Sequence, residues 1–360
     1  MICWMKRAIL RSLGRKWSAA ALRTYSSLGE RLHRELTSRN LPLNFDYLHT
    51  QPSYLLSLTL ADTLPKSPAW SHIHTSLPSV NRAPRMPAGH HLVYFPPQVT
   101  LSQLLPDGTD VLHSPGGPFD RRLWAGGRVK FPVSRDLTLN GARAVCIELI
   151  RDVIVKGREG AEKVIVKIER RIGIVQENEE ESSIKERIWK ETEDKTDHAS
   201  IIENRDLIFM RKKTHDELSH DKANFDNNQR VLKPPLGPDF RYTIEPTKSL
   251  LFRFSALTFN AHLIHLDETY TRNVEGYRNL LVHGPLTLTL LLTVLEAHLT
   301  KSNQTIRELC YRNLAPLYVE EPLTICGKPK IGKDGATWDV WIEGKNGGLA
   351  VRATALLSPV

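Results

Sequence analysis

Hydrophobic positions change their spacing along the chain and divide it into segments with different predicted structures. In residues 28–60, leucines such as Leu28, Leu32 and Leu36 recur at helical intervals, which predicts helices with one buried face. A proline-rich run over residues 64–87 then interrupts regular structure. From residue 92 onward, short apolar segments alternate with Pro, Gly and Asp clusters, which indicates a β-rich unit. Its predicted strands cover residues 92–95, 128–133, 144–155 and 164–174.

A strongly charged segment separates this unit from the rest of the chain. Residues 176–230 carry 25 charged side chains among 55 residues, so most of the segment cannot bury enough apolar surface to order itself. We interpret it as a solvated linker or insertion. Its apolar stretch, residues 201–210, is a candidate for the last strand of the first unit.

The C-terminal part combines extended patterns with one long apolar stretch. Residues 285–299 are apolar on nearly every side and follow Gly284, which favours a buried helix that begins at a proline. Residues 250–257 are predicted to be extended. Further strands are predicted at residues 314–319, 338–343 and 349–357, with Asn346-Gly347 as the hairpin signal between the last two. The pattern therefore predicts one long buried helix wrapped by an antiparallel sheet.

Composition and charge narrow the class of protein. With 360 residues, 41% of them hydrophobic, the chain has room for two folded units. The net charge of +9 is concentrated in residues 1–27, which hold six Lys or Arg and no acidic residue; the remainder has 43 basic against 40 acidic side chains. This balance argues against a nucleic-acid-binding face. No apolar run approaches the roughly 18 residues of a membrane span, so membrane insertion is not expected.

Residues 1–27 have the composition of a targeting segment. They are rich in Arg, Ser and Ala, and Ile2, Met5, Ile9 and Leu13 lie at helical spacing beside arginines. Basic residues interrupt the continuous apolar core that a secretory signal requires. We therefore predict a mitochondrial presequence with a cleavage pattern at residues 23–27, and a location in the mitochondrial matrix. A basic disordered tail is the alternative.

Cysteine spacing argues against a disulfide framework and a structural zinc site. The four cysteines lie far apart, without CxxC or Cys/His finger spacing, which fits a reducing compartment. His262 and His265 lie three residues apart, but no further cluster of ligands accompanies them. We therefore expect no metal site.

Two sequence blocks carry most of the candidate chemistry. The first consists of Ser255-Ala-Leu-Thr-Phe-Asn260-Ala-His262-Leu-Ile-His265-Leu-Asp267, then Glu275-Gly-Tyr277, then His283-Gly284-Pro285-Leu286. It resembles the hydratase-2 motif of MaoC-like hot-dog proteins, in the form found in mitochondrial hydroxyacyl-thioester dehydratase type 2 and mesaconyl-CoA hydratase relatives. The second block consists of Asp107-Gly108 and Arg121-Arg122-Leu-Trp124-Ala-Gly-Gly-Arg128. It resembles the first, degenerate hot-dog of the same family.

The resemblance runs from about residue 85 to the end of the chain and implies the fold and its division. The implied fold is an α+β double hot-dog, in which two antiparallel sheets each wrap a long central helix. A helical and proline-rich extension (28–85) follows the presequence (1–27). The first, degenerate hot-dog (86–230) contains the charged insertion from residue 176, and the second hot-dog (231–360) is catalytic.

The resemblance also implies an enzyme, a hydro-lyase that interconverts 3-hydroxyacyl and trans-2-enoyl thioesters in type II fatty-acid synthesis. Its substrate would be linked to acyl carrier protein or coenzyme A, and no cofactor is required because the thioester itself acidifies the α-carbon. Two hot-dogs in one chain can pair internally, so a monomer and a homodimer are both acceptable. The alternatives are a hydratase for a short dicarboxyl-CoA such as mesaconyl-CoA, and a non-catalytic scaffold that binds acyl thioesters.

Elimination of water requires a group that takes the α-proton and helps the β-hydroxyl to leave, together with donors for the carbonyl oxygen. His265 is the candidate acid and base, because an unperturbed imidazole has a pKa of about 6.5. Asn260 can hold the hydroxyl or water through its amide. Backbone N–H groups near His283 and Gly284, at the start of the predicted helix, are candidates to stabilise the oxyanion.

One departure from the family motif affects the mechanism. The motif carries an Asp at the position of Asn260, and an amide cannot act as a general base. We therefore expect either that His265 makes both proton transfers or that Asp267 or Glu275 substitutes. Asp267 as a helix cap and His283 as a capping or packing residue are the structural alternatives. The remaining substrate-binding candidates are Tyr277, Arg122 and Trp124, of which the last two either contact phosphates of the thioester carrier or belong to the core and its rim.

Overall fold

The structure, a computed structural model, describes most of the chain. The described residues are 19–64, 77–132, 137–189, 199–224, 231–300, 302–330 and 336–359, with side chains from residue 28 onward. The predicted presequence, residues 1–27, lies outside the described residues apart from the backbone of its last part. The presequence therefore stays a prediction.

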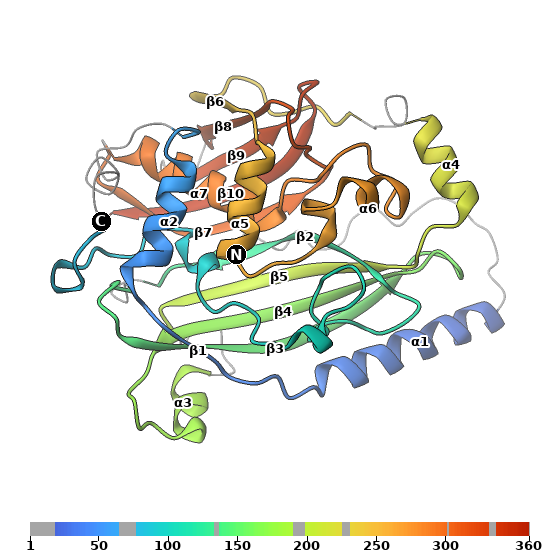
Figure 1. Cartoon of the computed structure of the whole chain (residues 1–360), viewed down its shortest axis with the longest axis horizontal. Helices are drawn as coiled ribbons and strands as arrows, with labels where there is room; N and C mark the ends of the chain where they lie inside the picture. Colours follow the sequence, from blue (N-terminus) through green and yellow to red (C-terminus); the bar gives the residue numbers. More distant parts are fainter. Residues whose placement is uncertain are drawn as a thin grey trace.

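Within the described residues, ten strands form one antiparallel sheet (Figure 1). Their order is β1-β3-β4-β5-β2-β7-β10-β9-β8-β6, so the first five strands and the last five each occupy one half of the sheet. The halves meet where residues 126–130 of β2 pair with residues 308–312 of β7. The strands are β1 (Asn44–Tyr47), β2 (Arg121–Lys130), β3 (Arg143–Lys156), β4 (Lys163–Ile174), β5 (Ile201–Met210), β6 (Phe240–Ile244), β7 (Gln304–Asn313), β8 (Leu323–Pro329), β9 (Thr337–Glu343) and β10 (Leu349–Pro359).

The long apolar helix α7 (Gly284–Leu299) forms the core of the C-terminal half, as predicted. Pro285 lies in its first turn, where the missing N–H removes no helical hydrogen bond. Leu286, Leu290 and Leu295 are completely buried, and the helix contacts β7, β8 and β9. A helix that is apolar on all sides is thus enclosed by the antiparallel sheet.

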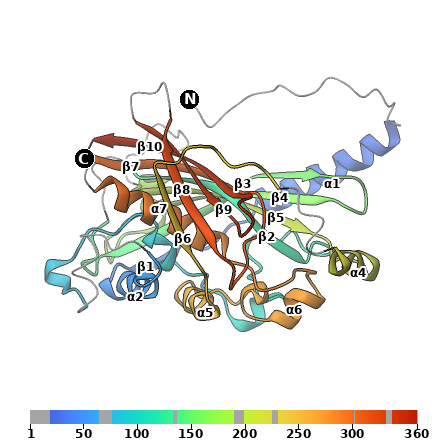
Figure 2. The same ribbon diagram turned by 90° about the horizontal axis from the view of Figure 1, so that it is seen from above.

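Helices other than α7 also cover the strands of the N-terminal half. Leu32 and Leu36 of α1 (Ala19–Thr37) belong to one buried cluster with Ile150 and Val153 of β3. On one side of the sheet, α2 (Thr50–Leu60), α5 (Lys248–Leu257) and α6 (Glu268–Asn273) form a row, with α2 in contact with α5 (Figures 1 and 2). Helices from both parts of the chain therefore cover the same side of the sheet.

Five of the predicted strands are confirmed. The predicted segments 144–155, 164–174, 201–210, 338–343 and 349–357 correspond to β3, β4, β5, β9 and β10. Gly347 lies in the turn between β9 and β10 with a φ of 70°, which suits the predicted hairpin. The division of the chain at residues 85 and 230 remains a prediction.

Three predicted extended segments have a different structure. Residues 250–257 belong to helix α5, whose first turn is capped by the Thr247 hydroxyl accepting the N–H of Leu250. Residues 92–95 overlap the 3₁₀ helix η2 (His90–Val93), which follows Gly89 in a left-handed conformation. Residues 314–319 form no strand. The chain is paired in β7 just before them and then meets Pro316, which has no N–H for a sheet.

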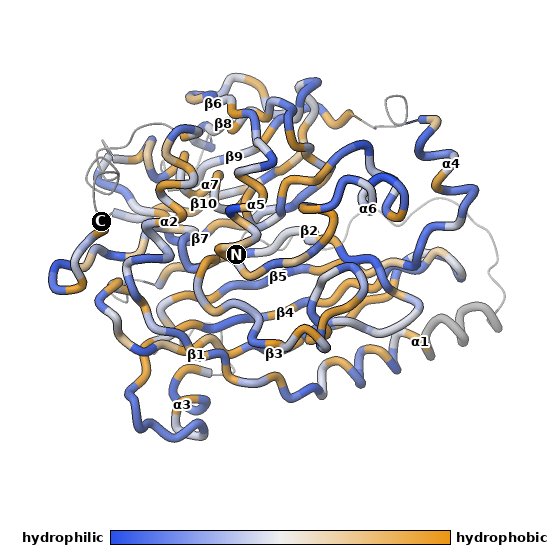
Figure 3. The backbone as a smooth tube through the Cα atoms, viewed as in Figure 1, coloured by the Kyte–Doolittle hydropathy of each residue, from blue (hydrophilic) through white to orange (hydrophobic). Residues whose placement is uncertain are grey.

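The charged segment of residues 176–230 is not simply a linker. It contains α3 (Glu181–Ile188), the central strand β5 and α4 (His215–Ala223). Ile184 and Ile188 of α3 are buried in a cluster with Val145 and Ile147 of β3. Figure 3 shows that the segment around α3 is mostly hydrophilic. Its two buried isoleucines therefore supply the apolar contact between this polar segment and the sheet.

Candidate functional site

A cavity of about 820 Å³ is lined by residues of both halves of the chain. Six of the predicted site residues line it: His265, Asn260, Gly284, Tyr277, Arg122 and Trp124. The other three, Asp267, Glu275 and His283, are not among the lining residues. The cavity therefore brings together side chains from β2 and from the segment that precedes α7.

His265 is held with one ring nitrogen engaged. It ends the short 3₁₀ helix η4 (Leu263–His265) and is 7% exposed. Its Nδ1 lies 2.7 Å from the carbonyl oxygen of Leu281, and because a carbonyl only accepts, Nδ1 carries the proton and donates. In the neutral ring, Nε2 is then the unprotonated nitrogen. Burial lowers the pKa of His265 to about 4, which keeps the ring neutral near pH 7.

Two more imidazoles surround His265. The ring of His283 stacks on it with centroids 3.7 Å apart, and the ring of His262 meets it edge-on at 5.5 Å. His283 is completely buried and hydrogen-bonds through Nε2 to the Ser255 hydroxyl at 2.8 Å. Burial and the neighbouring imidazoles lower the pKa of both His262 and His283 well below the ordinary value. The three rings therefore form a neutral cluster that disfavours extra positive charge.

Asn260 follows a sharp turn at the end of α5. Phe259 has a φ of 52°, which is rare for an aromatic residue, and the N–H of Asn260 donates to the carbonyl of Ser255. The side-chain Oδ1 of Asn260 accepts the backbone N–H of His262 at 3.0 Å. The Nδ2 group is thereby the part of the amide that remains for a ligand in the cavity.

The N-terminus of α7 opens onto the cavity at Gly284. The N–H groups in the first turn of a helix have no partner within the helix, and the helix dipole places partial positive charge there. A Cβ atom at Gly284 would lie 2.8 Å from Cβ of Trp124, so only glycine allows this approach. Such N–H groups can stabilise a developing oxyanion, and that role for them stays a prediction.

Trp124 and Arg122 project from β2 into the cavity wall. The Trp124 Nε1–H donates to the hydroxyl of Tyr311 at 2.6 Å, and Arg205 lies 4.8 Å over its ring. Arg122 donates to Asp110 at 3.0 Å. Both residues thus line the cavity and also hold neighbouring side chains.

Two predicted carboxylates have structural partners away from the cavity. Asp267 is exposed and caps α6, where its Oδ1 accepts the N–H of Tyr270 at 2.9 Å. Glu275 is buried and accepts from Nε of Arg121 at 2.7 Å. This arrangement corresponds to the capping alternative for Asp267 and leaves neither group facing the cavity. Burial raises the pKa of the cavity-lining Tyr277 to about 12, so its phenol stays protonated.

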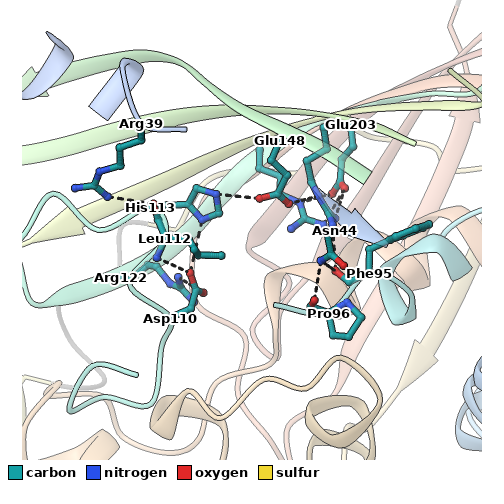
Figure 4. A network of polar contacts seen from close by, with 12 residues as sticks. Arg39, Asn44, Phe95, Pro96, Asp110, Leu112, His113, Arg122, Glu148 and Glu203 are labelled. Carbon is teal, nitrogen blue, oxygen red and sulfur yellow. Dashed lines mark hydrogen bonds and ion pairs between the residues drawn. The ribbon is translucent and has the colours of Figure 1, made fainter. Parts of the chain in front are cut away.

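A largely buried row of charged residues in the N-terminal half was not predicted from the sequence. Glu148 of β3, Arg170 of β4 and Glu203 of β5 are direct cross-strand neighbours, and Arg170 forms ion pairs with both carboxylates. Glu148 also contacts His113 at 3.1 Å, as Figure 4 shows. The signal in the sequence was the Glu169-Arg170-Arg171 triplet that interrupts the apolar alternation of β4.

The described part of the chain shows neither the ligand cluster of a metal site nor a membrane-spanning helix. No group of three or more His, Cys, Asp or Glu side chains there is arranged to hold a metal ion. No described helix is long and apolar enough to cross a membrane. Cys146, Cys310 and Cys326 form no disulfide.

Comparisons with known proteins identify the family to which the chain is similar. The family model of hydroxyacyl-thioester dehydratase type 2 matches residues 89–319. The chain is 39% identical over 127 residues to the mesaconyl-C(4)-CoA hydratase of Chloroflexus aurantiacus, which covers 35% of this chain and 43% of that protein. It is 29% identical over 226 residues to the mitochondrial hydroxyacyl-thioester dehydratase type 2 of Schizosaccharomyces pombe, which covers 62% and 69%. The chain thus matches less than half the length of the first of these relatives.

A solved structure supports the fold. The MaoC-like dehydratase of Phytophthora capsici superimposes with a TM-score of 0.57 over 91% of this chain and 99% of that one, at 10% sequence identity. At this identity the likeness concerns the fold alone. It confirms the predicted α+β hot-dog class.

Proposed function

Because the chain belongs to the hydroxyacyl-thioester dehydratase type 2 family, we propose that it is a hydro-lyase that interconverts 3-hydroxyacyl and trans-2-enoyl thioesters. The observation that carries this proposal is the state of His265. Its Nδ1–H donates to the carbonyl of Leu281, and its low pKa leaves Nε2 as an unprotonated base at the cavity wall. A neutral, oriented imidazole is what removal of an α-proton requires.

The dehydration can proceed with this one histidine. Nε2 of His265 takes the α-proton, and the electrons of the C–H bond move to the carbonyl oxygen, where N–H groups beside Gly284 stabilise the enolate. As the carbonyl re-forms, the double bond forms and the β-hydroxyl leaves, taking the proton from His265 to become water. The Nδ2 group of Asn260 donates to the departing hydroxyl. His265 begins and ends neutral, so the amide at position 260 is not required to act as a base.

The substrate carrier and the location extend this proposal. We propose that the acyl group arrives on acyl carrier protein or coenzyme A and that the enzyme acts in type II fatty-acid synthesis in the mitochondrial matrix. The basic, acid-free composition of residues 1–27 supports this location. So does the similarity to the Schizosaccharomyces pombe relative, which is named as a mitochondrial protein.

Hydration of enoyl thioesters by the full-length protein tests the activity. Loss of enoyl absorbance would be followed with crotonyl-CoA and with a longer trans-2-enoyl-CoA. We expect turnover with at least one of them and a fall of about 100-fold or more in His265→Ala, since positioned acid–base catalysis contributes about that much. His215→Ala, at an exposed histidine of α4, is the matched control and should keep wild-type turnover. Equal turnover by wild type and His265→Ala would refute the proposed role.

A second candidate function is hydration of a short dicarboxyl-CoA. It is favoured by Arg122, a guanidinium in the cavity wall that suits a carboxylate, and by the likeness to a mesaconyl-C(4)-CoA hydratase. A panel of straight-chain enoyl and mesaconyl thioesters separates the two functions. Acyl-thioester binding without turnover of any panel member would instead identify a non-catalytic scaffold.

A further inference from the structure

A loop of the N-terminal half packs directly against the segment that carries Asn260 and His265. The backbone N–H of Leu263 donates to the carbonyl oxygen of Asp107 at 2.8 Å. Gly108 has a φ of 81°, and a Cβ atom there would lie 2.0 Å from the carbonyl oxygen of Ala261. The loop and the candidate catalytic segment are therefore in backbone contact, and this contact depends on a glycine in a left-handed conformation.

The carboxylate of Asp107 lies beside the histidine cluster. Its Oδ1 accepts the N–H and the hydroxyl of Thr109, at 2.9 and 2.7 Å. Its Oδ2 lies 3.5 Å from Nε2 of His262, and both of these atoms are buried with no closer hydrogen-bond partner among the described residues. The His262 ring lines the cavity and meets His265 edge-on. Asp107 therefore contacts the cluster through His262.

The same loop is anchored to the sheet by the buried charges of Figure 4. Asp110 accepts from Arg122 of β2, and His113 contacts Glu148 of β3, which is paired with Arg170 of β4. Buried polar networks whose members are all paired are rigid. The loop is thus fixed at one end to the N-terminal half and at the other to residues 261–263.

We propose that Asp107 is a positioning residue for the dehydration, acting through His262 on the segment that holds Asn260 and His265. This inference rests on the proposed function. Asp267 and Glu275, the carboxylates expected from the sequence, are engaged elsewhere, whereas Asp107 contacts the cluster from the other half of the chain. A carboxylate on Nε2 of His262 orients that ring, and the ring edge in turn restricts His265.

Asp107→Asn in the full-length protein isolates the charged contact. An asparagine keeps an Oδ1 acceptor for Thr109, and it replaces the charged Oδ2 acceptor that faces His262 by an uncharged NH2 donor. We expect kcat to fall by about 10- to 100-fold with KM changed less than about twofold, because a small misplacement of a catalytic group lowers the rate by about that much. Asp152→Asn is the matched control: Asp152 also faces a histidine, His33, at 3.4 Å, neither residue lines the cavity, and its variant should keep wild-type kcat.

A double variant tests whether Asp107 acts through His262. If it does, Asp107→Asn should cause little further loss of kcat in a His262→Gln background, so the two changes are strongly non-additive. Wild-type kcat in Asp107→Asn would overturn the inference, and so would losses that multiply independently in the double variant. A fall in kcat accompanied by an equal loss of folded protein, measured by thermal unfolding, would also overturn it in favour of a structural role.

The outcomes for this inference and for the proposed function are separable. A wild-type protein that turns over no enoyl thioester contradicts the proposed function. A wild-type protein that is active and whose turnover depends on His265, but whose Asp107→Asn variant is unaffected, contradicts only the inference about Asp107.

Discussion

The imidazole of His283 lies flat on that of His265, with ring centroids 3.7 Å apart and planes inclined by 24°. His283 does not line the cavity, and its Nε2 is hydrogen-bonded to the Ser255 hydroxyl. His283 therefore packs against His265 on a side of the ring that lies away from the cavity lining. Its place at the start of α7 links the position of His265 to the helix whose first residue, Gly284, lines the cavity.

Removal of the stacked ring should affect both rate and stability. We expect His283→Leu to lower kcat about tenfold, because His265 loses its supporting plane. The free energy of unfolding should fall by about 1–3 kcal/mol, since the buried Ser255 hydroxyl is left unpaired. Denaturant unfolding measures this loss. Ser255→Ala in the same background should recover part of it, and an unchanged kcat in His283→Leu would contradict the supporting role.

The pH dependence of the reaction should report the low pKa of His265. Burial lowers this pKa to about 4, and the neutral ring is the active base, so protonation inactivates the enzyme only as the pH falls through that value. We expect kcat/KM for crotonyl-CoA hydration to stay nearly constant from about pH 8 to about pH 5 and to fall below about pH 4. Return to neutral pH should restore activity. A midpoint near pH 6.5 would show that the ring is not desolvated as described.

Gly284→Ala should disturb the start of α7. The added methyl group meets Trp124 at 2.8 Å, so either the tryptophan or the helix must shift. Overpacking of this kind costs about 1–3 kcal/mol of unfolding free energy, and we expect a clear loss of kcat because the oxyanion donors move. Gly344→Ala, where the nearest atom lies at 3.6 Å, is the matched control. Equal activity of the two variants would argue against oxyanion binding at this terminus.

Arg170→Met should test the buried charge row. The change leaves the buried Glu203 and the half-buried Glu148 without their shared partner, and removing one partner of a buried ion pair costs about 3–5 kcal/mol. Thermal and denaturant unfolding would measure the loss. Arg34→Met, on the exposed face of α1, should change stability by less than about 0.5 kcal/mol. Similar stabilities for the two variants would mean that the row is not a structural anchor.

Local patterns predicted much of the fold, and long-range contacts account for what they missed. The apolar helix, strands β3 to β5 and the final hairpin followed from periodicity, because each buries a continuous apolar face. The prediction that residues 250–257 are extended was wrong because the apolar residues of α5 also fit an extended pattern. The Thr247 cap is the local signal that distinguishes the helix. The six predicted residues that line the cavity lie in the two motif blocks. The contact of Asp107 with His262 joins positions 155 residues apart, so no spacing rule could reveal it.

The sheet continues from β2 into β7, so its two halves are joined in one molecule and can differ in sequence. In a dimer of identical subunits, symmetry repeats every substitution in both partners. Here both halves belong to one polypeptide, so a change in one half leaves the other unaltered. Glu148 and Arg170 of the first half and His262 and His265 of the second half could therefore arise independently although they line the same cavity. A single polypeptide can therefore carry different residues in its two halves, whereas the two subunits of a homodimer must carry the same residues.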